Sequence, residues 1–231
     1  MTTKLAENLA RIRADIEACA AASNVLPPLL VGVSKTVGPN EIRTAHGAGL
    51  IDFGENRLQD YLTKIEQLHD LTDIRWHFIG PLQRNKVRKL LKTKPALIHS
   101  VDSLRLAETI DRIAREESLS PVNVLIEVNV VNEAGKHGFS VAAIHEEASR
   151  LVELTHVRIQ GCMTMAPFTD DTTIIDDCFT QTRKLVDSLS KRFGAHRFGT
   201  TCSMGMTNDY HVAIRRGATI VRIGSALFHG E

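Results

Sequence analysis

The stretch LLVGVSKTVGPNEIRTAHGAGLIDFG, residues 29–54, contains the repeating unit from which the fold of this chain can be predicted. It begins with an apolar run at 29–34 that has the length and composition of a buried strand. Pro39 then fits the first position of a helix over 39–47, and a second apolar run follows at 50–54. A strand, a helix and a strand in this order predict a βαβ unit of a parallel sheet.

The same alternation continues along the rest of the chain. An amphipathic helix is predicted ahead of it, over residues 4–20, because apolar side chains recur there at helical spacing. Apolar runs predict eight strands, at 29–34, 50–54, 74–79, 97–101, 122–129, 157–163, 198–203 and 219–223. Helical periodicity between them predicts helices at 39–47, 56–69, 84–91, 103–117, 141–155, 174–192 and 207–216.

This order of elements favours one fold class. Strands that alternate with helices, with no segment left for a second sheet, favour a closed barrel over an open doubly wound sheet. A chain of 231 residues with 43% hydrophobic content suits one barrel of this kind. We therefore predict an α/β fold, a single (β/α)8 TIM barrel over residues 1–231 with an extra N-terminal helix. The longest loops after strands, 130–140 and 164–172, are predicted to lie at the rim where such barrels bind ligands.

Charge and composition exclude several classes of partner. A formal net charge of +1 gives no long-range attraction for nucleic acid or a membrane surface, so we expect neither as a partner. The N-terminus lacks a secretion signal pattern, and no apolar run approaches the roughly 18–20 residues of a membrane span, so we expect a cytoplasmic protein. The four cysteines have no paired spacing, which disfavours disulfides and zinc knuckles and suggests small buried hydrophobes.

Two junctions near the end of the chain predict a phosphate site. CSMGMTND at 202–209 follows the seventh predicted strand, and RIGSALF at 222–228 follows the eighth. Each places a glycine and a hydroxyl residue where a helix begins, and free backbone N–H groups attract anions there. In barrels of this class the loops after strands 7 and 8 often bind phosphate. The alternative is that Gly205 and Gly224 only permit tight turns.

Lys35 ends the first predicted strand and would face these junctions. It could pair with a phosphate as a point charge, or its neutral amine could attack an aldehyde to form a Schiff base. Partial burial and the neighbouring Arg222 would lower its pKa and favour the Schiff base. An aldehyde that also carries a phosphate is pyridoxal 5′-phosphate (PLP). The structural alternative is an ordinary lysine that extends from the rim into solvent.

Three further motifs have simpler interpretations. His77, in the third predicted strand, is interpreted as a core histidine satisfied by hydrogen bonds rather than as a site base. HEEAS at 145–149 lacks the second histidine of a zinc motif, since Ser149 stands in its place. RNKVRKLLKTK at 84–94 carries six cations, which are interpreted as the solvated face of a short helix, with docking of an anionic partner as the alternative.

Several longer motifs carry a family resemblance that spans nearly the whole chain in order. These are VSKT at 33–36, FGENRLQD at 53–60, WHFIGPLQRNK at 76–86, GCMTMAP at 161–167, SMGMTND at 203–209 and VRIGSALFHG at 221–230. The sequence resembles the pyridoxal phosphate homeostasis protein family, also called the YggS or PROSC family. The resemblance implies a PLP-binding barrel of the alanine racemase N-terminal type.

The resemblance also implies roles for individual residues. Lys35 would hold PLP as a Schiff base, and Asn56 would lie beside the cofactor ring. Arg222 would face the pyridine nitrogen, where a permanent donor weakens the ring as an electron sink. The phosphate would be held by hydroxyls and backbone amides of Ser203, Met204, Gly205, Gly224 and Ser225.

The function implied is binding of PLP in intracellular PLP homeostasis, with no assigned reaction. PLP-dependent apoenzymes are the candidate recipients, and the chain is expected to be a monomer or a weak homodimer. The alternative is a small PLP-dependent amino-acid racemase or lyase. Racemisation needs an acid and a base on opposite faces of the substrate, and the sequence offers no evident second group. Because the sequence ends at Glu231, we also expect no C-terminal β-domain such as alanine racemases use to supply a catalytic tyrosine.

Overall fold

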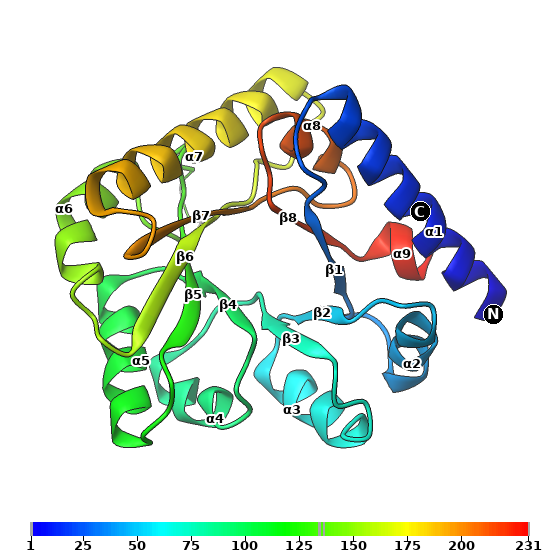
Figure 1. Ribbon diagram of the computed structural model, residues 1–231, viewed down its shortest axis with the longest axis horizontal. Helices are drawn as coiled ribbons and strands as arrows, with labels where there is room; N and C mark the ends of the chain where they lie inside the picture. The colour runs from blue at the N-terminus through cyan, green and yellow to red at the C-terminus, as the bar shows by residue number, and fades with distance from the viewer. Residues whose placement is uncertain (1, 134, 136, 231) are drawn as a thin grey trace.

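Eight parallel strands close into a barrel (Figure 1). The computed structural model describes residues 2–133, 135 and 137–230. Each strand pairs with its neighbours in chain order, and β1 pairs with β8 to close the ring. The strands are β1 (Leu29–Val33), β2 (Asp52–Glu55), β3 (Arg75–Phe78), β4 (Leu97–Val101), β5 (Val122–Glu127), β6 (Val157–Met163), β7 (Phe198–Ser203) and β8 (Ile220–Ile223). The predicted (β/α)8 barrel is confirmed.

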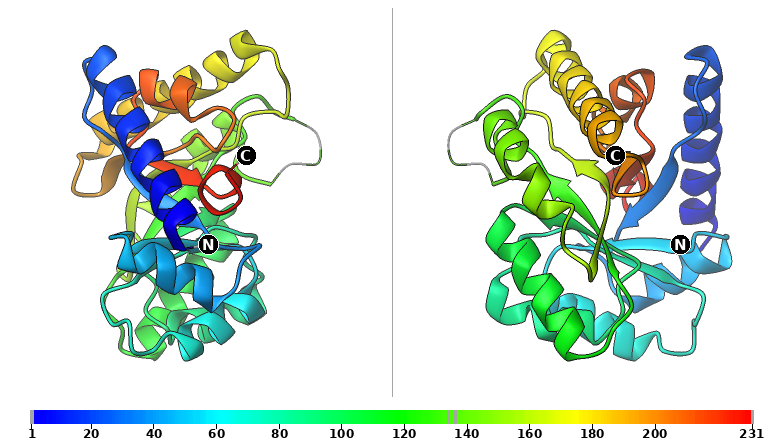
Figure 2. Two further views of the ribbon diagram at one scale, coloured as in Figure 1. Left: turned by 90° about the vertical axis from the view of Figure 1, so that its right-hand side faces the viewer. Right: turned by 60° about the vertical axis from the view of Figure 1, so that its left-hand side comes forward.

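Helices cover the outside of the ring. They are α1 (Thr2–Ala22), α2 (Pro39–Gly47), α3 (Leu58–Gln67), α4 (Val87–Leu91), α5 (Leu104–Glu116), α6 (Val141–Leu151), α7 (Thr172–Phe193), α8 (Tyr210–Arg215) and α9 (Ser225–Phe228). The predicted N-terminal helix is α1, which runs along the outside of the barrel beside α9 (Figure 2). Its apolar stripe, which includes Leu9 and Ile12, is buried. No helix in the described part of the chain is long and apolar enough to cross a membrane.

A few predicted bounds differ from the structure. The strand predicted at 50–54 is β2 at Asp52–Glu55, because pairing with β3 begins at Asp52. The helix predicted at 84–91 opens with one 3-10 turn, η1 (Arg84–Lys86), before α4. The helix predicted at 207–216 begins only at Tyr210, because Asp209 Oδ1 accepts the Met206 N–H at 2.5 Å and closes a turn there.

Two predictions reach residues outside the described part of the chain. The single domain over 1–231 stays a prediction, and its end residues, Met1 and Glu231, lie outside the described residues. The predicted rim loop at 130–140 does follow β5, but Ala134 and Lys136 within it also lie outside the described residues.

Other predictions from the apolar pattern are confirmed. Cys162, Cys178 and Cys202 are buried, and Cys19 is partly buried. The apolar stripe of α4 is buried, and the cations of 84–94 are exposed. One of them, Arg88, pairs with glutamates at the end of α5.

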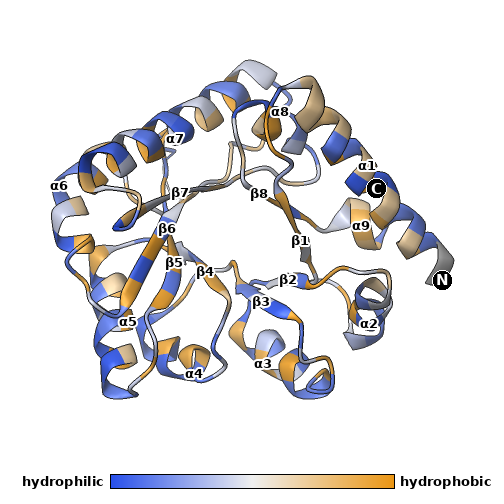
Figure 3. Cartoon of the chain, viewed as in Figure 1, coloured by the Kyte–Doolittle hydropathy of each residue, from blue (hydrophilic) through white to orange (hydrophobic). Residues whose placement is uncertain are grey.

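The core has an outer and an inner part. Most buried apolar side chains belong to one large cluster that includes residues of the strands and the surrounding helices. A separate apolar cluster consists only of strand residues: Val31, Leu97, Leu125, Met163 and Ile220. The strands also carry buried polar residues, and hydrophilic colouring is visible on β3 within the ring (Figure 3). The barrel is therefore partly polar inside.

The register shifts where β5, β6 and β7 pair. Where β5 advances by one residue, from Val124 to Leu125, β6 advances by two, from Ile159 to Gly161. Over the same step β7 advances by three residues, from Phe198 to Thr201. Such bulges bend a strand and change which face a side chain takes. Gly161 has φ +144°, and a Cβ there would lie 2.0 Å from the Thr201 carbonyl oxygen. Beyond the shift, Glu127, Met163 and Ser203 are paired at one level.

Candidate functional site

The carboxyl ends of the strands bring the predicted site residues to one end of the barrel. Lys35 lies in the turn that follows β1 and is exposed. The expected partial burial of Lys35 is therefore wrong, because the chain leaves the sheet after Val33 and the lysine lies at the rim rather than in the wall. Asn56 follows β2 directly and is partly buried.

A buried ion pair holds the chain immediately before Lys35. The Glu55 carboxylate accepts hydrogen bonds at Oε1 from Ser34 Oγ and from Lys64 Nζ, both at 2.6 Å. Lys64 also donates to the Ser34 carbonyl oxygen at 2.8 Å. The Glu55 and Lys64 side chains are only 0% and 9% exposed, so water screens the pair little. The end of β1 is thus tied to β2 and α3, and the lysine that follows starts from a rigid position.

Arg222 is a buried cation with neutral hydrogen-bond partners. Its guanidinium donates through Nη1 to Ser203 Oγ at 2.6 Å and through Nη2 to the Thr164 carbonyl oxygen at 3.0 Å. Burial lowers the pKa of Arg222 to about 10, against the opposing effects of Asp209 and Glu127. The side chain therefore stays protonated at neutral pH and offers a fixed donor.

Two buried carboxyl groups contribute to the electrostatics around Arg222. Burial raises the pKa of Glu127, at the end of β5, and nearby Asp102 raises it further. Burial likewise raises the pKa of Asp209, which follows β7. Arg222 acts in the opposite direction on both carboxyl groups, so a buried cation and two acids with weakened ionisation share this end of the barrel.

The loops after β7 and β8 lie against each other. Ser225 Oγ donates to Thr207 Oγ1 at 3.1 Å, and the Arg222 N–H donates to the Gly205 carbonyl oxygen at 2.9 Å. Gly205 has φ +94°, and a Cβ there would lie 2.6 Å from the Ala213 Cβ. A glycine is therefore required at this turn both by conformation and by space.

The remaining phosphate residues of the sequence prediction occupy different environments. Gly224 follows β8, and a Cβ there would lie 3.1 Å from the Val33 carbonyl oxygen, so the backbone approaches β1 closely. Met204 is fully buried, and its N–H donates to the Ile220 carbonyl oxygen at 3.1 Å. The Met204 amide is thus engaged within the barrel wall, whereas Ser203, Gly205, Gly224 and Ser225 gather around the two loops.

Sequence reasoning missed residues that contact this site from other strands. His99 of β4 contacts Ser203 Oγ through Nδ1 at 2.9 Å, and Thr164 after β6 contacts Arg222 through its carbonyl oxygen. The signal for His99 was its position in LIHSV, two residues after the apolar Leu97, which places both on one face of the strand. His77 is buried and hydrogen-bonded, so its interpretation as a satisfied core histidine is confirmed.

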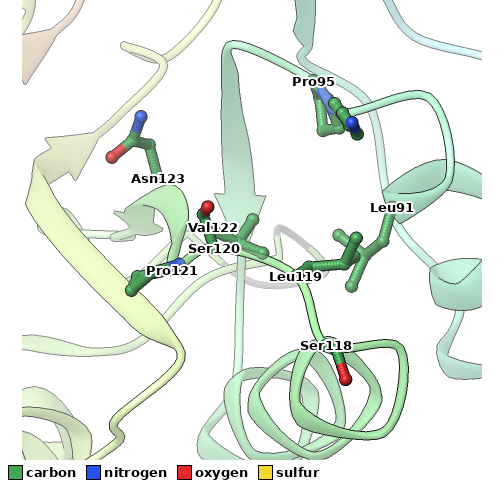
Figure 4. Close-up of a pocket in the computed structure, with 9 residues that line it drawn as sticks. Leu91, Pro95, Ser118, Leu119, Ser120, Pro121, Val122 and Asn123 are labelled. Atoms are coloured by element: carbon green, nitrogen blue, oxygen red, sulfur yellow. The ribbon is translucent and has the colours of Figure 1, made fainter.

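The opposite end of the barrel carries a cavity of about 320 Å³ that contains none of these residues. It lies between the turn before β4 and the loop before β5 (Figure 4), and is lined among others by Leu91, Pro95 and Leu119. Among the described residues no group of three or more His, Cys, Asp or Glu side chains is placed to hold a metal ion.

Comparison with known proteins agrees with this arrangement. A family model described as alanine racemase, N-terminal domain, matches residues 5–231. The pyridoxal phosphate homeostasis protein of Aquifex aeolicus is 43% identical over 199 residues, which cover 86% of this chain and 85% of that protein. The protein of the same name from Pseudomonas aeruginosa is 39% identical over 226 residues, covering 97% of this chain and 94% of that one. This chain belongs to the pyridoxal phosphate homeostasis protein family.

Solved structures agree with the family and with the fold. PipY of Synechococcus elongatus, in a structure with PLP bound, superposes with a TM-score of 0.86 at 35% identity, covering 97% of this chain and 99% of that chain. Alanine racemase from Corynebacterium glutamicum superposes with a TM-score of 0.73 at 15% identity, covering 98% of this chain and 61% of that one. The second likeness shows the barrel fold alone.

Proposed function

We propose that this chain binds PLP at the carboxyl end of the barrel and serves PLP homeostasis by holding and supplying the cofactor. The observation that carries the proposal is the pairing of Arg222 with Ser203 beside the joined loops after β7 and β8, at the same end of the barrel as Lys35. The PLP-bound structure of PipY, which this chain resembles over nearly its whole length, supports the same ligand here.

The residues present fit the phosphate of this cofactor. Glycines at 205 and 224 let the backbone approach closely, and the Ser203, Thr207 and Ser225 hydroxyls lie in or next to the same two loops. A cradle of backbone and hydroxyl groups suits a phosphate ester. We assign the phosphate to these two loops, with the Met204 side chain supporting them from the core.

The other proposed contacts follow from the chemistry of each group. Lys35 would hold the aldehyde carbon as a Schiff base, Arg222 would donate to the pyridine nitrogen, and Asn56 would lie beside the ring. When bound, the cofactor supplies a reactive aldehyde and an electron-withdrawing ring. A permanent donor at the ring nitrogen discourages its protonation and weakens that electron withdrawal. This suits a protein that holds the cofactor more than one that turns over amino acids.

The tyrosines also support a holding role. A racemase needs a second proton-transferring group opposite the lysine. This chain has two tyrosines: the Tyr61 hydroxyl accepts from Thr93 Oγ1 at 3.3 Å, and the Tyr210 hydroxyl donates to Asp15 of α1. Both are therefore engaged in the helical layer. We propose that the chain acts without a reaction of its own, as a monomer or weak homodimer that passes PLP to apoenzymes.

An absorbance titration tests the binding. The chain mixed with PLP should develop an absorbance band at about 420 nm, which borohydride removes by fixing the cofactor to the protein. Lys35→Ala should abolish the band, while Lys89→Ala, at an exposed lysine of α4, should leave it unchanged. A wild-type chain that takes up no PLP would contradict the proposal.

The racemase or lyase alternative predicts a different result. Incubation of the PLP-loaded chain with L-amino acids in deuterated water would give fast exchange at Cα with turnover if the chain were such an enzyme. We expect no turnover. Transfer is tested separately, by mixing the loaded chain with a PLP-dependent apoenzyme and following recovery of that enzyme's activity.

A further inference from the structure

A continuous chain of buried hydrogen bonds crosses the inside of the barrel and ends at the phosphate residues. Asp52 Oδ1 contacts His77 Nε2, His77 Nδ1 contacts His99 Nε2, and His99 Nδ1 contacts Ser203 Oγ, each at 2.9 Å. Ser203 Oγ then accepts from Arg222 Nη1 at 2.6 Å. All five side chains belong to residues that are at most 5% exposed. This row of hydrogen bonds links β2, β3 and β4 to β7 and β8, and it starts at the amino-terminal end of β2.

The two end residues of this row, Asp52 and Arg222, fix the direction of its hydrogen bonds. Arg222 can only donate and an ionised Asp52 can only accept. With both histidines neutral, one arrangement satisfies every contact: His77 donates from Nε2 to Asp52, and His99 donates from Nε2 to His77 Nδ1. The Ser203 hydroxyl must then donate to His99 Nδ1. In this arrangement its single hydrogen is engaged and cannot reach a ligand.

One added proton reverses the direction of two of these hydrogen bonds, the one between His77 and His99 and the one between His99 and Ser203. If His77 carries protons on both nitrogens, its Nδ1 donates to His99 Nε2, and His99 becomes the tautomer with the proton on Nδ1. His99 then donates to Ser203 Oγ, which accepts from His99 and Arg222 together. The Ser203 hydrogen is released and can point to a third acceptor. The added proton comes from solvent and no heavy atom has to move.

We infer that His77 and His99 are positioning residues for the anion site, which release the Ser203 hydroxyl hydrogen to a bound phosphate group as His77 takes up one proton. The inference rests on the proposed binding of PLP for the identity of the phosphate ester. A phosphate that accepts a hydrogen bond from Ser203 favours the state in which His77 carries the extra proton. Phosphate binding and proton uptake therefore strengthen each other.

The charges around the two histidines suit this coupling. His77 faces the Asp52 carboxylate on one side and neutral His99 on the other, with Arg75 bound to the second oxygen of Asp52. Hydrogen bonds from His77 and Arg75 outweigh the effect of burial and lower the pKa of Asp52, so the acceptor end stays ionised. Burial, with His77 and Arg222 nearby, lowers the pKa of His99 well below its usual value. His77 contacts the Asp52 carboxylate and His99 does not, so the extra proton is placed on His77 and His99 only changes tautomer.

Nitrogen-15 NMR of the histidine rings tests the arrangement directly in the wild-type chain. In the free chain at about pH 8, both His77 and His99 should be protonated on Nε2 only. Saturation with PLP, or in a separate sample with inorganic phosphate, should give His77 protonated on both nitrogens and His99 protonated on Nδ1. Finding His99 protonated on Nδ1 in the free chain, or unchanged tautomers in the bound one, would overturn the inference.

The pH dependence of PLP affinity gives a second readout. Between about pH 6 and 8, the wild-type dissociation constant should rise with pH more steeply than that of His77→Gln, by up to about tenfold per pH unit. Ser203→Ala should flatten the dependence in the same way, and the double variant should add little to either change. His69→Gln, at an exposed histidine after α3, should keep the wild-type slope. A purely structural role would weaken binding of His77→Gln equally at every pH, which would overturn the coupling.

The two ligands separate this inference from the proposed function. PLP that binds with the tautomers unchanged would support the proposed function and refute the coupling. Inorganic phosphate that switches the tautomers in a chain that takes up no PLP would support the coupling and refute the cofactor assignment. If neither ligand binds, both are refuted. Because the NMR arm uses the wild-type chain, a variant that fails to fold leaves the test intact.

Discussion

Lys64→Met removes one partner of the buried ion pair that precedes Lys35. Methionine keeps the apolar stem and deletes the charge, so Glu55 would keep only its 2.6 Å hydrogen bond from Ser34. Its other oxygen, Oε2, has no hydrogen-bond partner among the described residues. Breaking a buried pair from one side costs about 3–5 kcal/mol, because a charge is left uncompensated. At roughly 2–4 °C per kcal/mol for a chain of this size, the melting temperature should fall by roughly 6–20 °C.

Urea unfolding followed by circular dichroism measures this loss. Lys89→Met, at an exposed lysine of α4, is the matched control and should change the free energy of unfolding by less than about 0.5 kcal/mol. The double variant Glu55→Gln, Lys64→Met should recover most of the stability, since no buried charge remains without a partner. A Lys64→Met variant within about 1 kcal/mol of wild type would refute the view that this pair is electrostatically buried.

Three further outcomes follow from the site and the core. Gly205→Ala should destabilise the fold by about 1–3 kcal/mol in urea unfolding and weaken PLP binding, because Gly205 has a positive φ and lies close to the Ala213 Cβ. The control Gly47→Ala, at a position with open space around it, should be neutral or slightly stabilising. Glu127→Gln should raise the free energy of unfolding at pH 7, because burial raises the pKa of this carboxyl group and its ionisation therefore opposes folding. The gain in stability should shrink as the pH falls through that raised pKa toward 4.5. A gain that stays constant with pH would contradict the assignment. Alkylation of the native chain should label Cys19 and spare the other three thiols until the chain unfolds, as mass spectrometry can check.

Local patterns were sufficient to predict the order and type of the elements. The strand at 97–101 occurs where its apolar run predicted it, because a parallel barrel strand is buried by its own wall and by the helices outside. The two loops to which we assign the phosphate were also predictable as candidates, since each glycine and hydroxyl residue lies next to a strand end in the sequence. The errors at β2 and α8 arose where pairing or a turn, rather than composition, decides where an element begins.

Long-range polar contacts could not be predicted in the same way. His99 and Ser203 are 104 residues apart in the chain and meet only because the barrel closes. Asp52 lies within the apolar run at 50–54, and this acidic residue is buried there because His77 and Arg75 satisfy its carboxylate. The exposure of Lys35 likewise depends on where β1 ends, which its sequence motif alone does not determine.

The register shift between β5, β6 and β7 limits how this chain can change its length during evolution. Side chains alternate between the two faces of a strand, so deletion of Cys162, which follows the bulge, would place Met163 opposite Ile126 and turn it from the inner cluster toward the helices. The same deletion would shift Thr164 by one position along the strand, so its carbonyl oxygen would lose its hydrogen bond from Arg222. Insertions and deletions in homologous chains are therefore expected in the rim loop at 164–172, and not within the seven residues of β6.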